Sequence, residues 1–322
     1  MSAIENKAIS IKELYQNVVR YLNENQYLNA KQYLERVPRE VLWSSPPLLN
    51  ALGIAYRGLA QPQASIRCYL KALKIESTSG TWANLGNAYK DANMINSAIR
   101  AHKESINISE TPNATQWHNY GLSLSIAGKH RSAITAFEKS LKLDPSQLGV
   151  KWDLARSQLY IGNYKEGFHN YQFRWSMKDA PPKRVHGRDW QGQPLQSEEP
   201  LFVYAEQGFG DYIQCVRYLQ ALTNLVKNLK VEVKTELQEL MEFSFPDINF
   251  VNYQSSPVNF PDGWVVSLLD LPKYFSDQHF LAASGYLKFP QMSDDSILET
   301  LDKYKKYKNV GVVWGGEFNV QA

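Results

Sequence analysis

The chain has 322 residues, of which 43% are hydrophobic and 21% charged, and its formal net charge is +3. This length accommodates two domains, and the composition is that of a globular protein. The small positive charge does not indicate nucleic-acid binding. No apolar stretch approaches the roughly 18 residues that cross a bilayer, and residues 1–10 lack the apolar core of a signal peptide. We therefore expect no nucleic-acid partner, no membrane span and a cytoplasmic location.

The first half of the chain is organised by a period close to 35 residues. Trp82, Trp117 and Trp152 follow one another at intervals of 35 positions. Small and large residues recur around them at matching offsets, as with Gly86 and Gly121. A small residue is needed where two helices approach closely, and a proline such as Pro145 ends a helix because it has no N–H group to donate. The pattern predicts successive helix pairs over residues 11–175, after an N-terminal tail at 1–10.

This pattern resembles the tetratricopeptide repeat family, in which each repeat is one helix pair. Full units are expected around Gly53, Gly86 and Gly121, with a fourth starting at Trp152 and an atypical unit over about 11–37. That makes four to five helix pairs in a superhelix, and a divergent first unit is typical of a cap. An unrelated helical bundle is the alternative. His102 falls at the large-residue position of its unit, which favours a packing role.

Stacked helix pairs expose a concave surface that binds extended peptides or partner helices. Residues expected to line this groove, on first helices, are Asn84, Asn87, Lys90 and Asn119. Each amide offers both donors and an acceptor, so repeated asparagines would hold the backbone of a protein or peptide ligand. The alternative is that they are ordinary asparagines of a helix surface.

The periodicity fails after about residue 163, and turn residues increase. We expect a linker over 176–199 that folds back on the domains, since Trp175 and Trp190 argue against a free tether. Beyond it, apolar strands predicted at 201–205, 231–235, 250–251, 265–266 and 310–314 alternate with helices predicted at 211–229, 236–243 and 293–304. This alternation predicts a parallel sheet in an α/β domain over 200–322.

The motifs Glu-Gly-Phe, Arg-Trp and Trp-x-Gly-x-Pro-Leu precede Ala-Glu-Gln-Gly-Phe-Gly-Asp at 205–211. In this order they resemble bacterial proteins in which tetratricopeptide repeats are fused to a glycosyltransferase-like domain, similar to heptosyltransferases and, more distantly, to O-linked N-acetylglucosamine transferases. The resemblance implies that the second half is one Rossmann-like domain, the N-terminal half of a GT-B fold. It also implies a nucleotide-diphosphate sugar as donor substrate, with no other cofactor.

The loop between the first predicted strand and helix would lie at the carboxyl end of a parallel strand, where ligands bind in such sheets. The residues expected to contact an acceptor or sugar there are Glu206, Gln207, Gly208, Phe209, Gly210 and Gln214. Asp211 has two interpretations. It caps the helix, or, as the resemblance implies, it is the catalytic base that deprotonates the acceptor hydroxyl.

Other kinds of site find little support. The six histidines are dispersed without metal-ligand spacing, so we expect no metal site. Cys68 and Cys215 lie in apolar helical patterns and are expected to be packed thiols.

The resemblance breaks at Val310–Gly316, which looks like the first strand and turn of a second, donor-binding domain. We therefore expect a truncated or split enzyme that is inactive alone and needs a separate donor-domain polypeptide. The alternative is a non-catalytic interaction module with a vestigial α/β domain.

Overall fold

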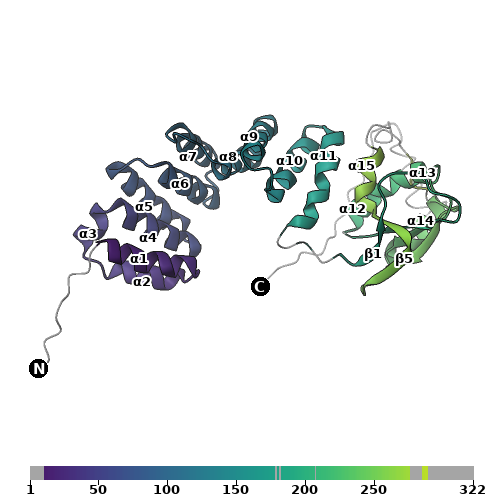
Figure 1. Ribbon diagram of the computed structural model, residues 1–322, viewed down its shortest axis with the longest axis horizontal. Helices are drawn as coiled ribbons and strands as arrows, with labels where there is room; N and C mark the ends of the chain where they lie inside the picture. Colours follow the sequence, from purple (N-terminus) through teal and green to yellow (C-terminus); the bar gives the residue numbers. More distant parts are fainter. Residues whose placement is uncertain (1–10, 178–179, 181–182, 207, 276–284, 289–322) are drawn as a thin grey trace, which may run out of the picture. The chain divides into compact units, whose positions relative to one another are not determined.

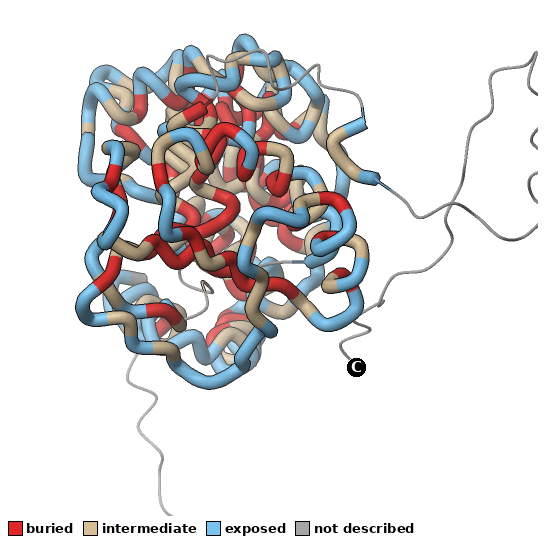
Figure 2. The backbone as a smooth tube through the Cα atoms, turned by 90° about the vertical axis from the view of Figure 1, so that its right-hand side faces the viewer, coloured by how far each residue is buried: buried red, intermediate tan, exposed pale blue. Residues whose placement is uncertain are grey.

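The computed structural model describes residues 11–177, 180, 183–206, 208–275 and 285–288. The chain forms two compact units, Met1–Pro182 and Lys183–Ala322. The helix predicted at 293–304 and the strand predicted at 310–314 lie outside the described residues. Buried stretches alternate with exposed ones along the chain of both units (Figure 2).

The first unit is a succession of helix pairs, stacked one after another in Figure 1. The helices are α1 (Ile11–Asn23), α2 (Tyr27–Glu35), α3 (Arg39–Ser44), α4 (Pro46–Gly58), α5 (Pro62–Ile75), α6 (Ser79–Asp91), α7 (Ile95–Asn107), α8 (Ala114–Ile126), α9 (His130–Leu143), α10 (Leu148–Tyr160) and α11 (Tyr164–Tyr171), followed by the 3-10 helix η1 (Gln172–Ser176). The predicted helix pairs are confirmed. The short α3 was not predicted from the sequence.

Local sequence explains where these helices begin and turn. Pro46 and Pro62 stand in the first turns of α4 and α5, where a missing N–H costs nothing. Asn113 precedes α8 and forms a capping box with Gln116. The Asn113 side chain accepts a hydrogen bond from the backbone N–H of Gln116, and the Gln116 side chain accepts one from the backbone N–H of Asn113. The turns inside the pairs each contain one residue with a left-handed backbone: Asn25, Ala60, Asn93, Gly128 and Gly162.

Within each full pair, a glycine of the first helix faces a ring of the second. A Cβ atom added to the glycine would collide with that ring, at 2.4 Å for Gly53 and Tyr69, 2.3 Å for Gly86 and His102, and 2.6 Å for Gly121 and Phe137. All three rings are almost fully buried. The predicted packing role of His102 is therefore confirmed, and it occupies the position that an aromatic residue takes in the neighbouring pairs.

The buried position changes the acid–base behaviour of His102. Its Nδ1 lies 2.9 Å from Ser123 Oγ, whereas its Nε2 is buried without a hydrogen-bond partner in the described part of the chain. Desolvation, and to a smaller extent the charge of Lys90, lowers the pKa of His102 from 6.5 to about 4. The ring is therefore neutral in the folded protein near neutral pH.

Replacing His102 with Phe should remove one source of acid instability. Because the folded-state pKa is depressed, protonation favours the unfolded chain, and the stabilisation present above pH 6.5 is lost as pH falls toward about 4. His102→Phe should change the free energy of unfolding at pH 7 by no more than about 1.5 kcal/mol. Wild type should lose about 3 kcal/mol more than the variant between pH 7 and pH 4. Urea unfolding across this pH range measures the difference, and parallel profiles would contradict the assignment.

The second unit is built on a five-stranded sheet in which the pairings between described strands are all parallel. Its strands are β1 (Val185–Asp189), β2 (Leu201–Tyr204), β3 (Leu229–Val233), β4 (Asn249–Asn252) and β5 (Val258–Ser267), in the order β1-β5-β2-β3-β4. The predicted parallel α/β sheet is confirmed, and β1 lies within the stretch 176–199 for which the sequence predicts a linker. Trp190 follows β1 and is buried against Tyr274.

The helices of this unit are short: α12 (Phe209–Cys215), η2 (Val216–Tyr218), α13 (Leu219–Leu222), η3 (Thr235–Leu237), α14 (Gln238–Ser244), η4 (Leu268–Asp270) and α15 (Leu271–Phe275). The single helix predicted over 211–229 is therefore wrong in extent. It begins earlier, at Phe209, and its last turn ends at Leu222. Leu229 instead pairs with Leu201 as part of β3. Its apolar side chain fits both a helical period and a strand, and strand pairing decided between them.

Candidate functional site

The predicted loop lies where the sequence places it, at the carboxyl end of β2. Glu206 is the second residue after β2, Gly208 is the residue before α12, and Gly208 and Gly210 are exposed. Phe209 is 43% exposed, and the Lys234 ammonium lies 5.1 Å from the centre of its ring. Gln214 is exposed one turn further along. Gln207 lies outside the described residues.

Asp211 lies in the first turn of α12 rather than at its cap, because the helix begins at Phe209. The capping interpretation is therefore wrong. The carboxylate is half-buried and forms no hydrogen bond or ion pair with a described residue. A negative charge in the first turn still interacts favourably with the helix dipole. The catalytic role of Asp211 remains a prediction.

The strand order reverses beside this loop. From β2 the chain proceeds outward on one side through β3 and β4, and then returns to β5 on the other side of β2. In open parallel sheets the crevice for a ligand opens at such a reversal. Ser267, the last residue of β5, donates a hydrogen bond to the Glu206 carboxylate across it. The sequence could not show this contact, because the position of β5 in the sheet was unknown.

A buried ion pair braces the same edge of the sheet. Glu232, in β3, is 1% exposed, and its carboxylate accepts from the guanidinium of Arg184 and from the backbone N–H groups of Ala205 and Gln254, at 3.0 and 3.2 Å. Arg184 also donates to the carbonyl groups of Gln254 and Ala205, at 2.7 and 3.2 Å. This pair ties the residue before β1 to the chain that leaves β2 and β4. A carboxylate within strand 229–233, flanked by Val231 and Val233, was the available signal in the sequence.

Removing Glu232 should destabilise the second unit strongly. Glu232→Ala leaves the Arg184 charge and two backbone N–H groups without their acceptor, and the loss of one member of a buried pair costs about 3–5 kcal/mol. Glu239→Ala, at an exposed position of α14, is the control and should change stability by less than about 0.5 kcal/mol. Chemical denaturation followed by circular dichroism measures both. Equal stability of the two variants would contradict the bracing role.

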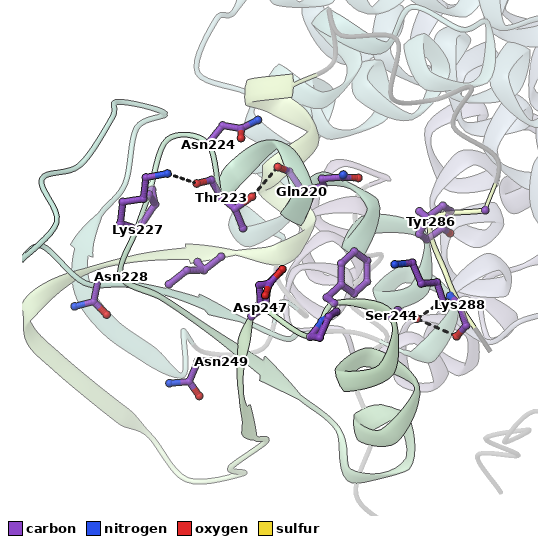
Figure 3. A pocket seen from close by; sticks show the side chains of 16 residues that line it. Gln220, Thr223, Asn224, Lys227, Asn228, Ser244, Asp247, Asn249, Tyr286 and Lys288 are labelled. Carbon is purple, nitrogen blue, oxygen red and sulfur yellow. Dashed lines mark hydrogen bonds between the residues drawn. The ribbon is translucent and has the colours of Figure 1, made fainter. Parts of the chain in front are cut away.

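A cavity lies elsewhere on this unit, at the amino ends of β3 and β4 (Figure 3). It has a volume of about 860 Å³. Its side chains include Lys227, which donates to the Thr223 carbonyl, and Ser244, which exchanges hydrogen bonds with the backbone of Lys288. The cavity is at the opposite end of the strands from the predicted loop, so it is separate from the predicted sugar site.

In the first unit, polar contacts link the first helices of neighbouring pairs. Asn84 donates to Asn50 Oδ1 at 3.1 Å, and His118 Nε2 lies 2.8 Å from Asp153 Oδ2. Two further contacts follow the same spacing: Arg57 with Asp91 at 2.5 Å, and Ser125 with Ser157 at 3.2 Å. The partners are separated by 32 to 35 residues in sequence. The repeat period could have identified these pairs.

The predicted groove residues lie on α6 and α8 and are half-buried. The side-chain amide of Asn84 donates a hydrogen bond to Asn50, whereas the side-chain amides of Asn87 and Asn119 form no hydrogen bond with a residue in the described ranges. Burial lowers the pKa of the Lys90 ammonium, which has no ion pair within the same ranges. The first helices therefore present a row of polar groups with unused hydrogen-bonding capacity.

Residues 46–79 and 116–147 match the family model described as tetratricopeptide repeat. The helical unit carries tetratricopeptide repeats. The alternative of an unrelated helical bundle is thereby excluded for these residues. These matched residues lie in the first unit, so the glycosyltransferase resemblance of the second unit remains a prediction.

Individual relatives match part of the chain. A 140-residue stretch is 29% identical to the anaphase-promoting complex subunit cut9 of Schizosaccharomyces pombe, covering 40% of this chain and 20% of that protein. Among solved structures, pilF of Pseudomonas aeruginosa is 23% identical, with a TM-score of 0.46, over 50% of this chain and 73% of its own. MamA of Desulfovibrio magneticus RS-1 is 20% identical, with a TM-score of 0.46, over 53% of this chain and 100% of its own.

Neither a metal-binding cluster nor a membrane-spanning helix occurs among the described residues. In those ranges, no group of three His, Cys, Asp or Glu side chains could hold a metal ion. None of the helices there combines the length and the apolar character that crossing a bilayer requires.

Proposed function

We propose that this protein is a binding scaffold whose tetratricopeptide unit holds a segment of a partner protein along its first helices. The observation that carries this proposal is the pair of half-buried amides on α6 and α8, Asn87 and Asn119, whose hydrogen-bonding capacity is unused within the described part of the chain. An extended peptide backbone needs partners of this kind, since an amide side chain can satisfy a backbone N–H and C=O together. Tetratricopeptide arrays present such surfaces to peptides and helices.

A peptide selection tests this role. A phage-displayed library of short random peptides is selected on the purified chain, and the binders are titrated against Asn87→Ala/Asn119→Ala. The double variant should weaken binding about tenfold or more, because each lost hydrogen bond is worth about 0.5–1.5 kcal/mol. Asn107→Ala, an asparagine exposed on the second helix α7, is the matched control and should bind as wild type does. Failure to select any peptide, or equal binding by all three proteins, would overturn the proposal.

A second candidate function concerns the α/β unit, which we propose to be the acceptor half of a sugar transferase. Three features support it: the reversal of strand order between β2 and β5, Glu206 at that reversal, and the exposed loop that begins α12. In a complete enzyme, Asp211 would take the proton of the acceptor hydroxyl as the sugar leaves its diphosphate. The nucleotide sugar would be held by a second, donor-binding domain.

This candidate predicts binding without turnover. Saturation-transfer NMR with a panel of methyl glycosides should detect contact with wild type, and Glu206→Ala should abolish it. Asp247→Ala, which alters the cavity at the opposite end of the strands, is the control and should leave the signal unchanged. The chain alone should release no nucleoside diphosphate from nucleotide sugars. A saturation-transfer signal that is unchanged in Glu206→Ala, or robust turnover of nucleotide sugar by the chain alone, would contradict the assignment.

A further inference from the structure

A hollow of about 460 Å³ lies between α8 and α10 of the tetratricopeptide unit. It is lined by the last turns of α8, the glycine turn that follows, the first residue of α9, and one face of α10. Its lining combines apolar and aromatic residues with charged ones.

The aromatic part of the lining consists of two stacked rings. His130 and Tyr160 lie parallel, with ring centres 4.3 Å apart and an interplanar angle of 7°. Tyr160 is 73% exposed, and Ile126, on the same hollow, is 55% exposed. The stack leaves much of the tyrosine in solvent and positions a flat aromatic surface at the rim. Another aromatic ring packs favourably on or against the edge of such a surface.

The two charged residues of the hollow, Asp153 and Arg156, differ in how far their hydrogen-bonding groups are already engaged. Asp153 Oδ2 lies 2.8 Å from His118 Nε2, so this oxygen is already engaged. Arg156 approaches the other oxygen, Oδ1, only to 3.9 Å, which is longer than a hydrogen bond. The Arg156 side chain is 57% exposed, and its guanidinium donates no hydrogen bond to a residue in the described ranges. Its planar fork of donors fits an incoming carboxylate in a bidentate arrangement.

The two features are close enough to be recognised together. Arg156 and Tyr160 are four residues apart on α10, and side chains with this spacing lie on the same face of a helix, about 5–6 Å apart at Cβ. Neighbouring side chains of a bound peptide span a similar distance. Both residues also lie on a first helix, as do the groups that we propose to hold the peptide backbone.

We propose that this hollow recognises an aromatic side chain of a partner protein that stands beside an Asp or Glu. The ring lies against Tyr160 and Ile126, and the carboxylate pairs with Arg156. This specificity rests on the proposed peptide-binding function of the tetratricopeptide unit. It adds a residue preference to the sequence-independent contacts of the asparagines.

A charge-reversal selection tests the preference. The random peptide library is selected in parallel on wild type, Arg156→Glu and Tyr160→Ala. Wild type should enrich peptides in which an aromatic residue adjoins an acidic one, by at least tenfold over the input library. Arg156→Glu should replace the acidic preference with a basic one, and Tyr160→Ala should lose the aromatic preference. Arg131→Glu and Tyr15→Ala, at exposed positions of α9 and α1, are matched controls and should keep the wild-type consensus.

Circular dichroism establishes that each variant is folded, and Arg156→Gln replaces Arg156→Glu if the latter is not. Arg156→Gln should lose the acidic preference without gaining a basic one. If wild type selects peptides that depend on Asn87 and Asn119 but the consensus is the same in every variant, the hollow is not the specificity site and the scaffold function stands. If wild type selects no peptide, both proposals fail.

Discussion

The close approach of two helices within each pair is the constraint on which the tetratricopeptide unit depends. It exists because a glycine on the first helix leaves room for a buried ring on the second, in three successive pairs. Once each pair is held at this distance, its first helix lies at a defined position relative to the next. The contacts between first helices then follow, and they recur with the period of the sequence. The surface that we propose for peptide binding is a consequence of this packing.

The first helices use their polar residues in two ways. Some pair with the equivalent helix of a neighbouring repeat, as Asn84 does with Asn50 of the preceding one. Others, such as Asn87 and Asn119, are half-buried and unused within the described residues. Half-burial lowers the cost of ordering a side chain on binding, and an unused amide gains a partner when a peptide arrives. Arg156 and Tyr160 would add selectivity to this otherwise general grip.

The α/β unit is organised differently, around a charged pair in its interior. A parallel sheet brings the carboxyl ends of its strands to one edge, where backbone groups leave the ladder and need new partners. Glu232 supplies an acceptor for two of these N–H groups, and Arg184 supplies donors for two carbonyl groups. The edge is thereby ordered next to the loop that carries Glu206 and Asp211. A rigid edge of this kind suits a binding site, because its side chains need little rearrangement when a ligand arrives.

Much of the first unit could be predicted from the sequence alone. A repeat of small, large and turn residues determines the helix pairs, since each position in the repeat meets the same surroundings. His102 could be assigned to packing for that reason. The alternation of apolar strands and helices was likewise sufficient to predict a parallel sheet in the second unit, and the loop after β2 lies at the edge that was expected.

Other features depend on contacts between distant residues, and only the tertiary structure decided them. Leu229 satisfies a helical period, yet it belongs to β3 because Leu201 is beside it. Strand β1 lacks an apolar alternation that would reveal it, and it exists because β5 offers an edge. Because α12 begins at Phe209, Asp211 lies in the first turn of this helix and not at its N-cap. The ion pair between Arg184 and Glu232 and the hydrogen bond between Ser267 and Glu206 could not be predicted without knowing the order of the strands in the sheet. Local periodicity describes which face of an element is apolar, but the neighbour that covers this face is determined by the whole chain.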